Sequence, residues 1–70
     1  MTGAHILLNG KERPLAAASL AGLLREAGIA AEKRGIAVAI NDAVVPRRDW
    51  AATIVRPGDR VEVVELFSGG

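Results

Sequence analysis

The chain has 70 residues and no cysteine, and its only aromatic side chains are Trp50 and Phe67. Without cysteine it can form no disulfide, thiolate metal site or iron–sulfur cluster, and it lacks a cysteine nucleophile. Its single histidine, His5, cannot hold a metal alone. Half of the residues are hydrophobic, which predicts one small folded domain with a thin core.

No charge of one sign dominates, because nine basic residues face eight acidic ones. A near-neutral chain lacks the basic excess that is typical of nucleic-acid binding. No apolar run approaches the length of a membrane span, and no signal-peptide pattern is present. We therefore expect a cytoplasmic protein with no nucleic-acid or membrane partner. No GxxxxGK[ST] loop or GxGxxG series opens a helix, so we expect no bound cofactor and no ATP chemistry within this chain.

The first elements form a hairpin. A short apolar run, residues 5–8, ends at Asn9-Gly10, a strong signal for a type I′ turn. Residues 11–13 return as a polar strand, and Pro14 is expected to limit its ladder. This second strand is predicted to lie at a sheet edge.

A helix follows the hairpin. Ser19 is a candidate N-cap, and the apolar stripe that follows it has helical spacing: Leu20, Leu23, Leu24 and Ala27. Gly28 suits the left-handed position after a helix, and Ile29 can make the accompanying apolar contact.

Three more strands are predicted, at residues 36–40, 43–45 and 60–66, with Trp50 in the long loop between the last two. We interpret Trp50 either as a structural plug for this loop or as a contact for a partner. The order strand, strand, helix, strand, strand, strand predicts an α+β protein. We expect a ubiquitin-like β-grasp fold: a mixed sheet of four to five strands with one helix packed across one face. Residues 1–66 would form this domain, and residues 67–70 a flexible C-terminal tail.

The chain stops at Gly69-Gly70, directly after the last strand, Phe67 and Ser68. Glycine lacks a Cβ, so such an end can pass through a slot that other side chains would block. An α-carboxylate is ionised at neutral pH, with a pKa of about 3.3–3.7, and can attack a phosphoanhydride. The alternative is an ordinary frayed terminus.

The chain resembles the ThiS family of sulfur carriers in thiamine biosynthesis. The resemblance covers nearly the whole length. It rests on the opening Ile6-Leu7-Leu8-Asn9-Gly10, the block from Val38 to Trp50, the run from Arg56 to Val64, and Gly69-Gly70. Residues 65–68 carry little family information.

The resemblance implies a carrier that is a substrate of enzymes and is not itself an enzyme. A ThiF-like adenylating enzyme, which uses ATP, would transfer AMP to the Gly70 carboxylate. A sulfur-donating desulfurase system would then supply a persulfide and leave a Gly70 thiocarboxylate. That sulfur would pass to a ThiG-like thiazole synthase. Gly69 and Ser68 would serve as the tail, and the free carrier would be a monomer.

A partner-binding surface is expected on the last strand. Alternation places Val61 and Val63 on one face and Val64 and Leu66 on the other. With the first pair under the helix, Val64, Leu66 and Phe67 would form a docking patch. The alternative is that these three side chains close the bottom of a small core.

Three other functions remain open. The small subunit of molybdopterin synthase also resembles a β-grasp domain that ends in Gly-Gly and carries a thiocarboxylate, although the short length and the block from Asn41 to Trp50 favour the thiamine branch. A ubiquitin-like modifier joined to lysines is the second. A plain binding module without chemistry at its end is a third reading.

Overall fold

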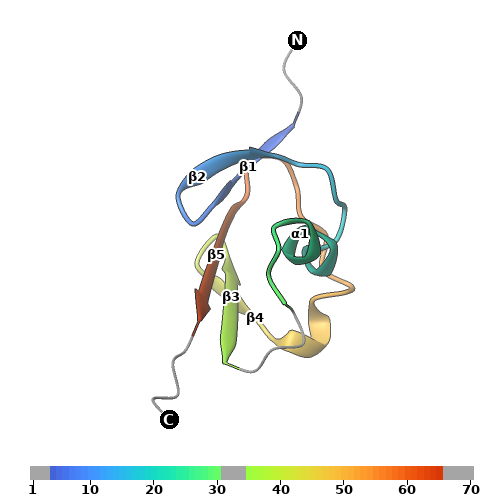
Figure 1. Cartoon of the computed structure of the whole chain (residues 1–70), viewed down its shortest axis with the longest axis vertical. Coiled ribbons are helices and arrows are strands. Elements are labelled where there is room, and N and C mark those ends of the chain that lie inside the picture. The colour runs from blue at the N-terminus through green and yellow to red at the C-terminus, as the bar shows by residue number, and fades with distance from the viewer. Residues whose placement is uncertain (1–3, 31–34, 66–70) are drawn as a thin grey trace.

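The computed structural model describes residues 4–30 and 35–65. The elements run in the order β1 (His5–Leu8), β2 (Lys11–Pro14), α1 (Leu20–Glu26), β3 (Ile36–Ile40), β4 (Ala43–Val45), the 3₁₀ segment η1 (Arg47–Asp49) and β5 (Arg60–Glu65). The five strands form one sheet in the order β2-β1-β5-β3-β4. Strands β1 and β5 are parallel, and the other neighbours are antiparallel. This mixed sheet with α1 on one side confirms the predicted β-grasp fold (Figure 1).

The first hairpin forms as predicted, with φ of 52° at Asn9 and 83° at Gly10. Both angles are positive, as a type I′ turn requires. The polar strand β2 lies at the sheet edge, also as predicted. Pro14 does not end the hydrogen bonding, because the Leu15 N–H still donates to the Ala4 carbonyl at 2.9 Å. Bonded and non-bonded positions alternate along an antiparallel pair, and Pro14 occupies a position that needs no N–H.

The ends of α1 follow from single residues. Ser19 is extended, with ψ of 156°, and its hydroxyl oxygen accepts a hydrogen bond from the Gly22 N–H at 3.1 Å. At the other end Gly28 has φ of +80°, and the Ile29 N–H donates to the Leu24 carbonyl at 2.9 Å. This pattern is a Schellman ending, in which glycine supplies the left-handed residue.

The core lies between α1 and the sheet. Among the described residues, eight buried side chains form it: Ile6, Leu20, Leu23, Leu24, Val38, Trp50, Val55 and Val61. The three leucines come from one stripe of α1, while the strands contribute alternate residues. The core is therefore one thin layer on a single face of the sheet.

Trp50 ties the long loop to this layer. Its side chain is 3% exposed, and its Nε1–H donates to the Val45 carbonyl at 2.8 Å. Its backbone carbonyl accepts from the Ala21 N–H at 3.1 Å, which joins the loop to the first turn of α1. Trp50 is thus a plug, because so little of its ring is left for a partner to touch.

Within the described ranges, no helix is long and apolar enough to cross a membrane.

Candidate functional site

The chemistry is predicted at Gly70, with Gly69 and Ser68 as its tail, and the docking patch at Leu66 and Phe67 as well as Val64. The first five of these residues lie outside the described ranges. The division into a domain of residues 1–66 and a tail of residues 67–70 therefore stays a prediction. The structure instead describes the strand that leads toward this segment, and Val64, the remaining predicted site residue.

Strand β5 is the central strand of the sheet, with β1 on one side and β3 on the other. The two sides differ in length. The β3 pairing runs from Val61 to Glu65, whereas the β1 pairing covers only Arg60 and Val61. The last part of β5 is thus held mainly by β3.

The two faces of β5 differ as the alternation predicts. Val61 is fully buried and Val63 packs against the core, while Glu62 is exposed. Val64 points away from the helix and is 53% exposed. Val64 therefore does not close the bottom of the core, and it is available as surface.

Val64 belongs to an apolar area on the sheet face opposite α1. Register places Val64 beside Ala37, and Ala39 between Val44 and Glu62. These residues line a shallow hollow of about 140 Å³. Val44, at 74% exposed, is its most open side chain. We call Ala37, Ala39, Val44 and Val64 the open-face patch.

The patch owes its shape to sequence. Alanine at positions 37 and 39 leaves a depression, because Ala39 stands between Val44 and Glu62, and Ala37 stands beside the longer Val64. Alternation along β3 places these alanines on the face opposite Val38, and their alignment with Val44 and Val64 depends on pairing register. Residue type alone did not single out Val44 as surface.

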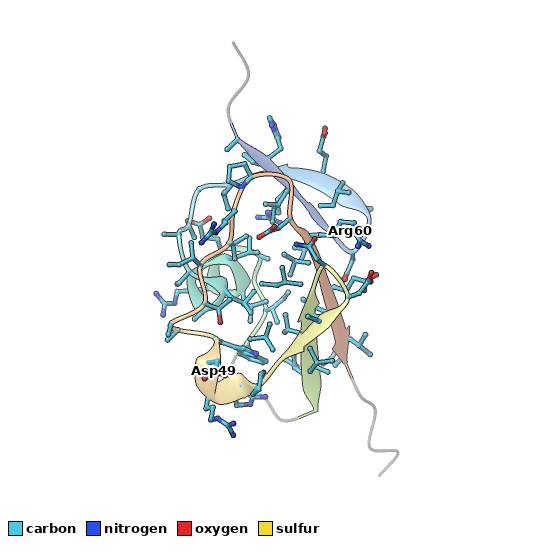
Figure 2. All side chains as sticks on the ribbon, turned by 180° about the vertical axis from the view of Figure 1, so that it is seen from behind. Asp49 and Arg60 are labelled. Carbon is cyan, nitrogen blue, oxygen red and sulfur yellow. The ribbon has the colours of Figure 1, made fainter. Side chains whose placement is uncertain are left out.

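The start of β5, opposite the end that carries Val64, is polar. The Arg60 guanidinium donates a hydrogen bond to the Asp42 carboxylate at 3.0 Å. Figure 2 shows Arg60 at the start of β5, beside the turn between β3 and β4 and well separated from Asp49 on η1. This hydrogen bond to Asp42 raises the pKa of Arg60 above its ordinary value. Both side chains are at least half exposed, so the pair contributes little to stability. The start of β5 thus carries the ion pair of Arg60 with Asp42, and the exposed apolar side chain of Val64 lies toward the other end of the strand.

Asp59 organises the turn before β5. One carboxylate oxygen accepts from the Arg56 N–H at 2.8 Å, and the other accepts from the Asn41 side-chain amide at 3.0 Å. The first bond is a local one, because aspartate after Pro57-Gly58 can accept from a nearby backbone N–H. The link to Asn41 depends on tertiary structure and has no local signal.

A metal centre finds no support in the part of the chain that the structure describes, where no three His, Asp or Glu side chains are grouped to hold an ion. The exposed surface that remains is one suited to contact with another protein: a shallow apolar hollow next to the end of β5.

Comparisons with known proteins agree with this geometry. The model of the ThiS family matches residues 6–70. The sulfur carrier protein ThiS of Thermus thermophilus is 38% identical over 65 residues, which cover 93% of this chain and 98% of that protein. The crystal structure of a thiamine biosynthesis protein (ThiS) from Geobacter metallireducens superimposes with a TM-score of 0.77 at 29% identity, covering 94% of this chain and 99% of that one.

A second kind of relative is longer. A thiazole synthase of Paramagnetospirillum magneticum is 35% identical over 66 residues, which cover 93% of this chain but only 20% of that protein. The chain thus spans about a fifth of the length of this relative and nearly all of the Thermus carrier. With the family match over residues 6–70, the β-grasp topology and the nearly full-length likeness to ThiS proteins, the chain belongs to the ThiS family.

Proposed function

We propose that this protein is a sulfur carrier in thiamine biosynthesis, with Gly70 as the residue that bears the sulfur. The observation that supports this most is the family match, which extends through Gly69 and Gly70 to residue 70. The Thermus relative, which is named a sulfur carrier protein, aligns over almost its whole length. The proposal requires a free α-carboxylate on Gly70 in the working protein.

The chemistry begins with activation. A carboxylate is a poor acyl donor because its leaving group would be oxide, and adenylation replaces that group with AMP. In the proposed first step, a Gly70 carboxylate oxygen attacks the α-phosphorus of ATP, and pyrophosphate leaves. The enzyme that binds ATP is a ThiF-like partner, so this chain needs no bound cofactor of its own.

Sulfur then enters by acyl transfer. The terminal sulfur of a persulfide on a desulfurase-type donor attacks the Gly70 carbonyl carbon, and AMP leaves with the C–O bond electrons. A thiol then attacks the donor sulfur, which breaks the S–S bond, forms a disulfide with the donor and frees the thiocarboxylate. In each step the carrier supplies an acyl group and no catalytic side chain, so we propose that it is a substrate and not an enzyme.

The role proposed for the scaffold is recognition. The open-face patch offers apolar surface at the end of β5, and Val64 stands six positions before Gly70 in the sequence. A partner that covers Val64 and Ala37 would meet the strand from which the chain continues toward Gly70. We propose that Leu66 and Phe67 extend this docking surface, with Phe67 as an aromatic anchor.

A ThiG-like thiazole synthase is the proposed acceptor of the sulfur. Two thiazole synthases, from Paramagnetospirillum magneticum and Magnetococcus marinus, contain a stretch similar to 93% of this chain that makes up 20% of each protein. A carrier-like segment within such a synthase suggests that carrier and acceptor act together. For the separate chain the same pairing would form by docking.

Reconstitution with labelled sulfur tests the function. The chain is incubated with ATP, a ThiF-like enzyme, a desulfurase with labelled sulfur, and a thiazole synthase with its substrates. We expect label in the thiazole product, and none when Gly70 is deleted.

Three other results would contradict the proposed function. Label that passes only to a molybdopterin precursor would place the carrier in that pathway. An isopeptide between Gly70 and lysines of other proteins would identify a protein modifier. Thiazole labelling that survives deletion of Gly70 would leave a plain binding module as the better description.

A further inference from the structure

The turns that follow β1 and β3, the two neighbours of β5, each begin with an asparagine that bonds to β5. Asn9 opens the turn after β1 with φ of 52°, and Asn41 opens the turn after β3 with φ of 51°. Each backbone N–H donates to β5, Asn9 to the Val61 carbonyl at 2.9 Å and Asn41 to the Arg60 carbonyl at 2.8 Å. Both asparagines therefore stand where the flanking strand leaves the ladder.

In both turns a side-chain carbonyl then continues the ladder. The Val63 N–H donates to Asn9 Oδ1 at 2.8 Å, and the Arg60 N–H donates to Asn41 Oδ1 at 2.9 Å. In a regular ladder a backbone carbonyl of the neighbouring strand would take this place. Asparagine tolerates positive φ, and its side-chain amide oxygen can take the place of that backbone carbonyl as the acceptor.

The two bonds hold different ends of β5. Asn41 binds Arg60, the first residue of the strand. Asn9 binds Val63, two residues beyond Val61, where the β1 pairing ends. The Asn9 bond thus extends the support on the β1 side into the half of β5 that carries Val64.

We propose that Asn9 is a positioning residue for the acyl-transfer end of this carrier. The proposal rests on the function proposed above. By holding the Val63 amide, Asn9 fixes the last half of β5, the part of the strand that carries Val64. A partner must bind the patch and receive the carboxylate together, so a frayed strand end would add an ordering cost to binding.

Two substitutions at Asn9 distinguish the effect of its bond to Val63 from the effect of the Asn9-Gly10 turn. Asp-Gly and Gly-Gly both suit a type I′ turn, so Asn9→Gly and Asn9→Asp each preserve the hairpin. Asn9→Asp retains a side-chain oxygen that can accept from Val63, whereas Asn9→Gly removes it. We expect amide hydrogen exchange at Val63 to rise about fivefold in Asn9→Gly, the factor set by one typical net hydrogen bond, and to stay near the original rate in Asn9→Asp.

The functional readout is adenylation by a ThiF-like enzyme. For Asn9→Gly we expect the KM for the carrier to rise about fivefold with kcat unchanged. Without the hydrogen bond within the carrier, the end of β5 must be ordered on binding, which weakens binding, while bound carrier reacts as before. Asn9→Asp should restore the original KM. This split distinguishes positioning of the strand from loss of the fold, which would lower the concentration of active carrier in every assay.

Asn41→Gly is the matched control. It removes an equivalent bond from the start of β5 and also the bond from the Asn41 amide to Asp59. It should therefore reduce stability at least as much as Asn9→Gly, yet leave KM nearly unchanged because the end near Val64 keeps its support. KM that rises for Asn9→Gly alone supports the proposal.

The contrary results are distinct. If Asn9→Gly accelerates Val63 exchange but leaves KM unchanged, or if Asn41→Gly raises KM equally, Asn9 has a structural role only. If the unmodified chain accepts no AMP, the proposed function itself fails, and the role of Asn9 in it fails too.

Discussion

The two faces of the sheet both carry aliphatic side chains, but they differ in how far those side chains are buried. On the covered face, Ile6, Val38 and Val61 are buried beneath α1. On the open face, Val44 and Val64 are at least half exposed, and the positions between them are alanine. One face contributes to the buried core, and the other leaves apolar surface without a described element above it.

This contrast indicates a division of labour. Burial of apolar area is the main stabilising term in a small domain, so apolar side chains left outside contribute little to folding. Grouped at the end of β5, they suit recognition of another protein. Changes on the covered face should therefore alter unfolding, and changes on the open face should alter binding. The predictions below test this separation, beginning with the largest effect.

Leu23→Ala should have the largest effect on stability. Leu23 is fully buried in the stripe of α1, and its truncation removes apolar contacts and leaves a cavity. We expect the free energy of unfolding to fall by about 2–5 kcal/mol, measured by urea denaturation. Where the folded state still dominates, affinity for the adenylating enzyme should stay the same. An affinity loss in folded protein would mean that the two faces are not independent.

Val64→Asp should have the opposite profile. Val64 is exposed, so a charged side chain there should change stability by no more than about 0.5 kcal/mol. Affinity for the adenylating enzyme should fall about tenfold, because a desolvated carboxylate replaces an apolar contact. The same experiment can be extended to Leu66→Asp and Phe67→Asp, for which unfolding would instead support a core role.

Ala51→Asp is the control for Val64→Asp. It adds the same charge at an exposed residue that does not line the hollow. We expect no change in affinity, measured by calorimetry under the same conditions. Equal weakening by both variants would point to a general charge effect and would remove the open-face patch from the account.

Ser19→Ala should have a smaller effect, confined to the covered side. It removes the oxygen that accepts from the Gly22 N–H at the start of α1. We expect a loss of about 1 kcal/mol in the free energy of unfolding, and near-complete recovery in Ser19→Asp, since aspartate is an equally good N-cap. If Ser19→Asp is as unstable as Ser19→Ala, the hydroxyl is not acting as a cap.

Most of the fold could be predicted from local chemistry. Asn9-Gly10 fixes one turn, Ser19 and Gly28 bound the helix, and alternation along β5 assigns Val61 and Val64 to opposite faces. Each of these features depends on a few neighbouring residues. The order of the elements then indicated the β-grasp arrangement that joins them, and the resemblance to the ThiS family agreed with it.

The rest could not be predicted because it depends on contacts distant in sequence. The hollow needs the register of three strands, and the bonds from Asn9 to Val63 and from Asn41 to Arg60 link residues 54 and 19 positions apart. Trp50 was open to two interpretations until its burial was known. The roles of Gly70, Gly69, Ser68, Leu66 and Phe67 stay predictions, since those residues lie outside the described ranges.

Intact mass spectrometry tests the central claim most directly. The chain is incubated with ATP, a ThiF-like enzyme and a sulfur donor, and its mass is compared with that of a form lacking Gly70. The account predicts that only the full chain gains the mass of one sulfur in exchange for one oxygen. No gain in the full chain, or the same gain without Gly70, would contradict it.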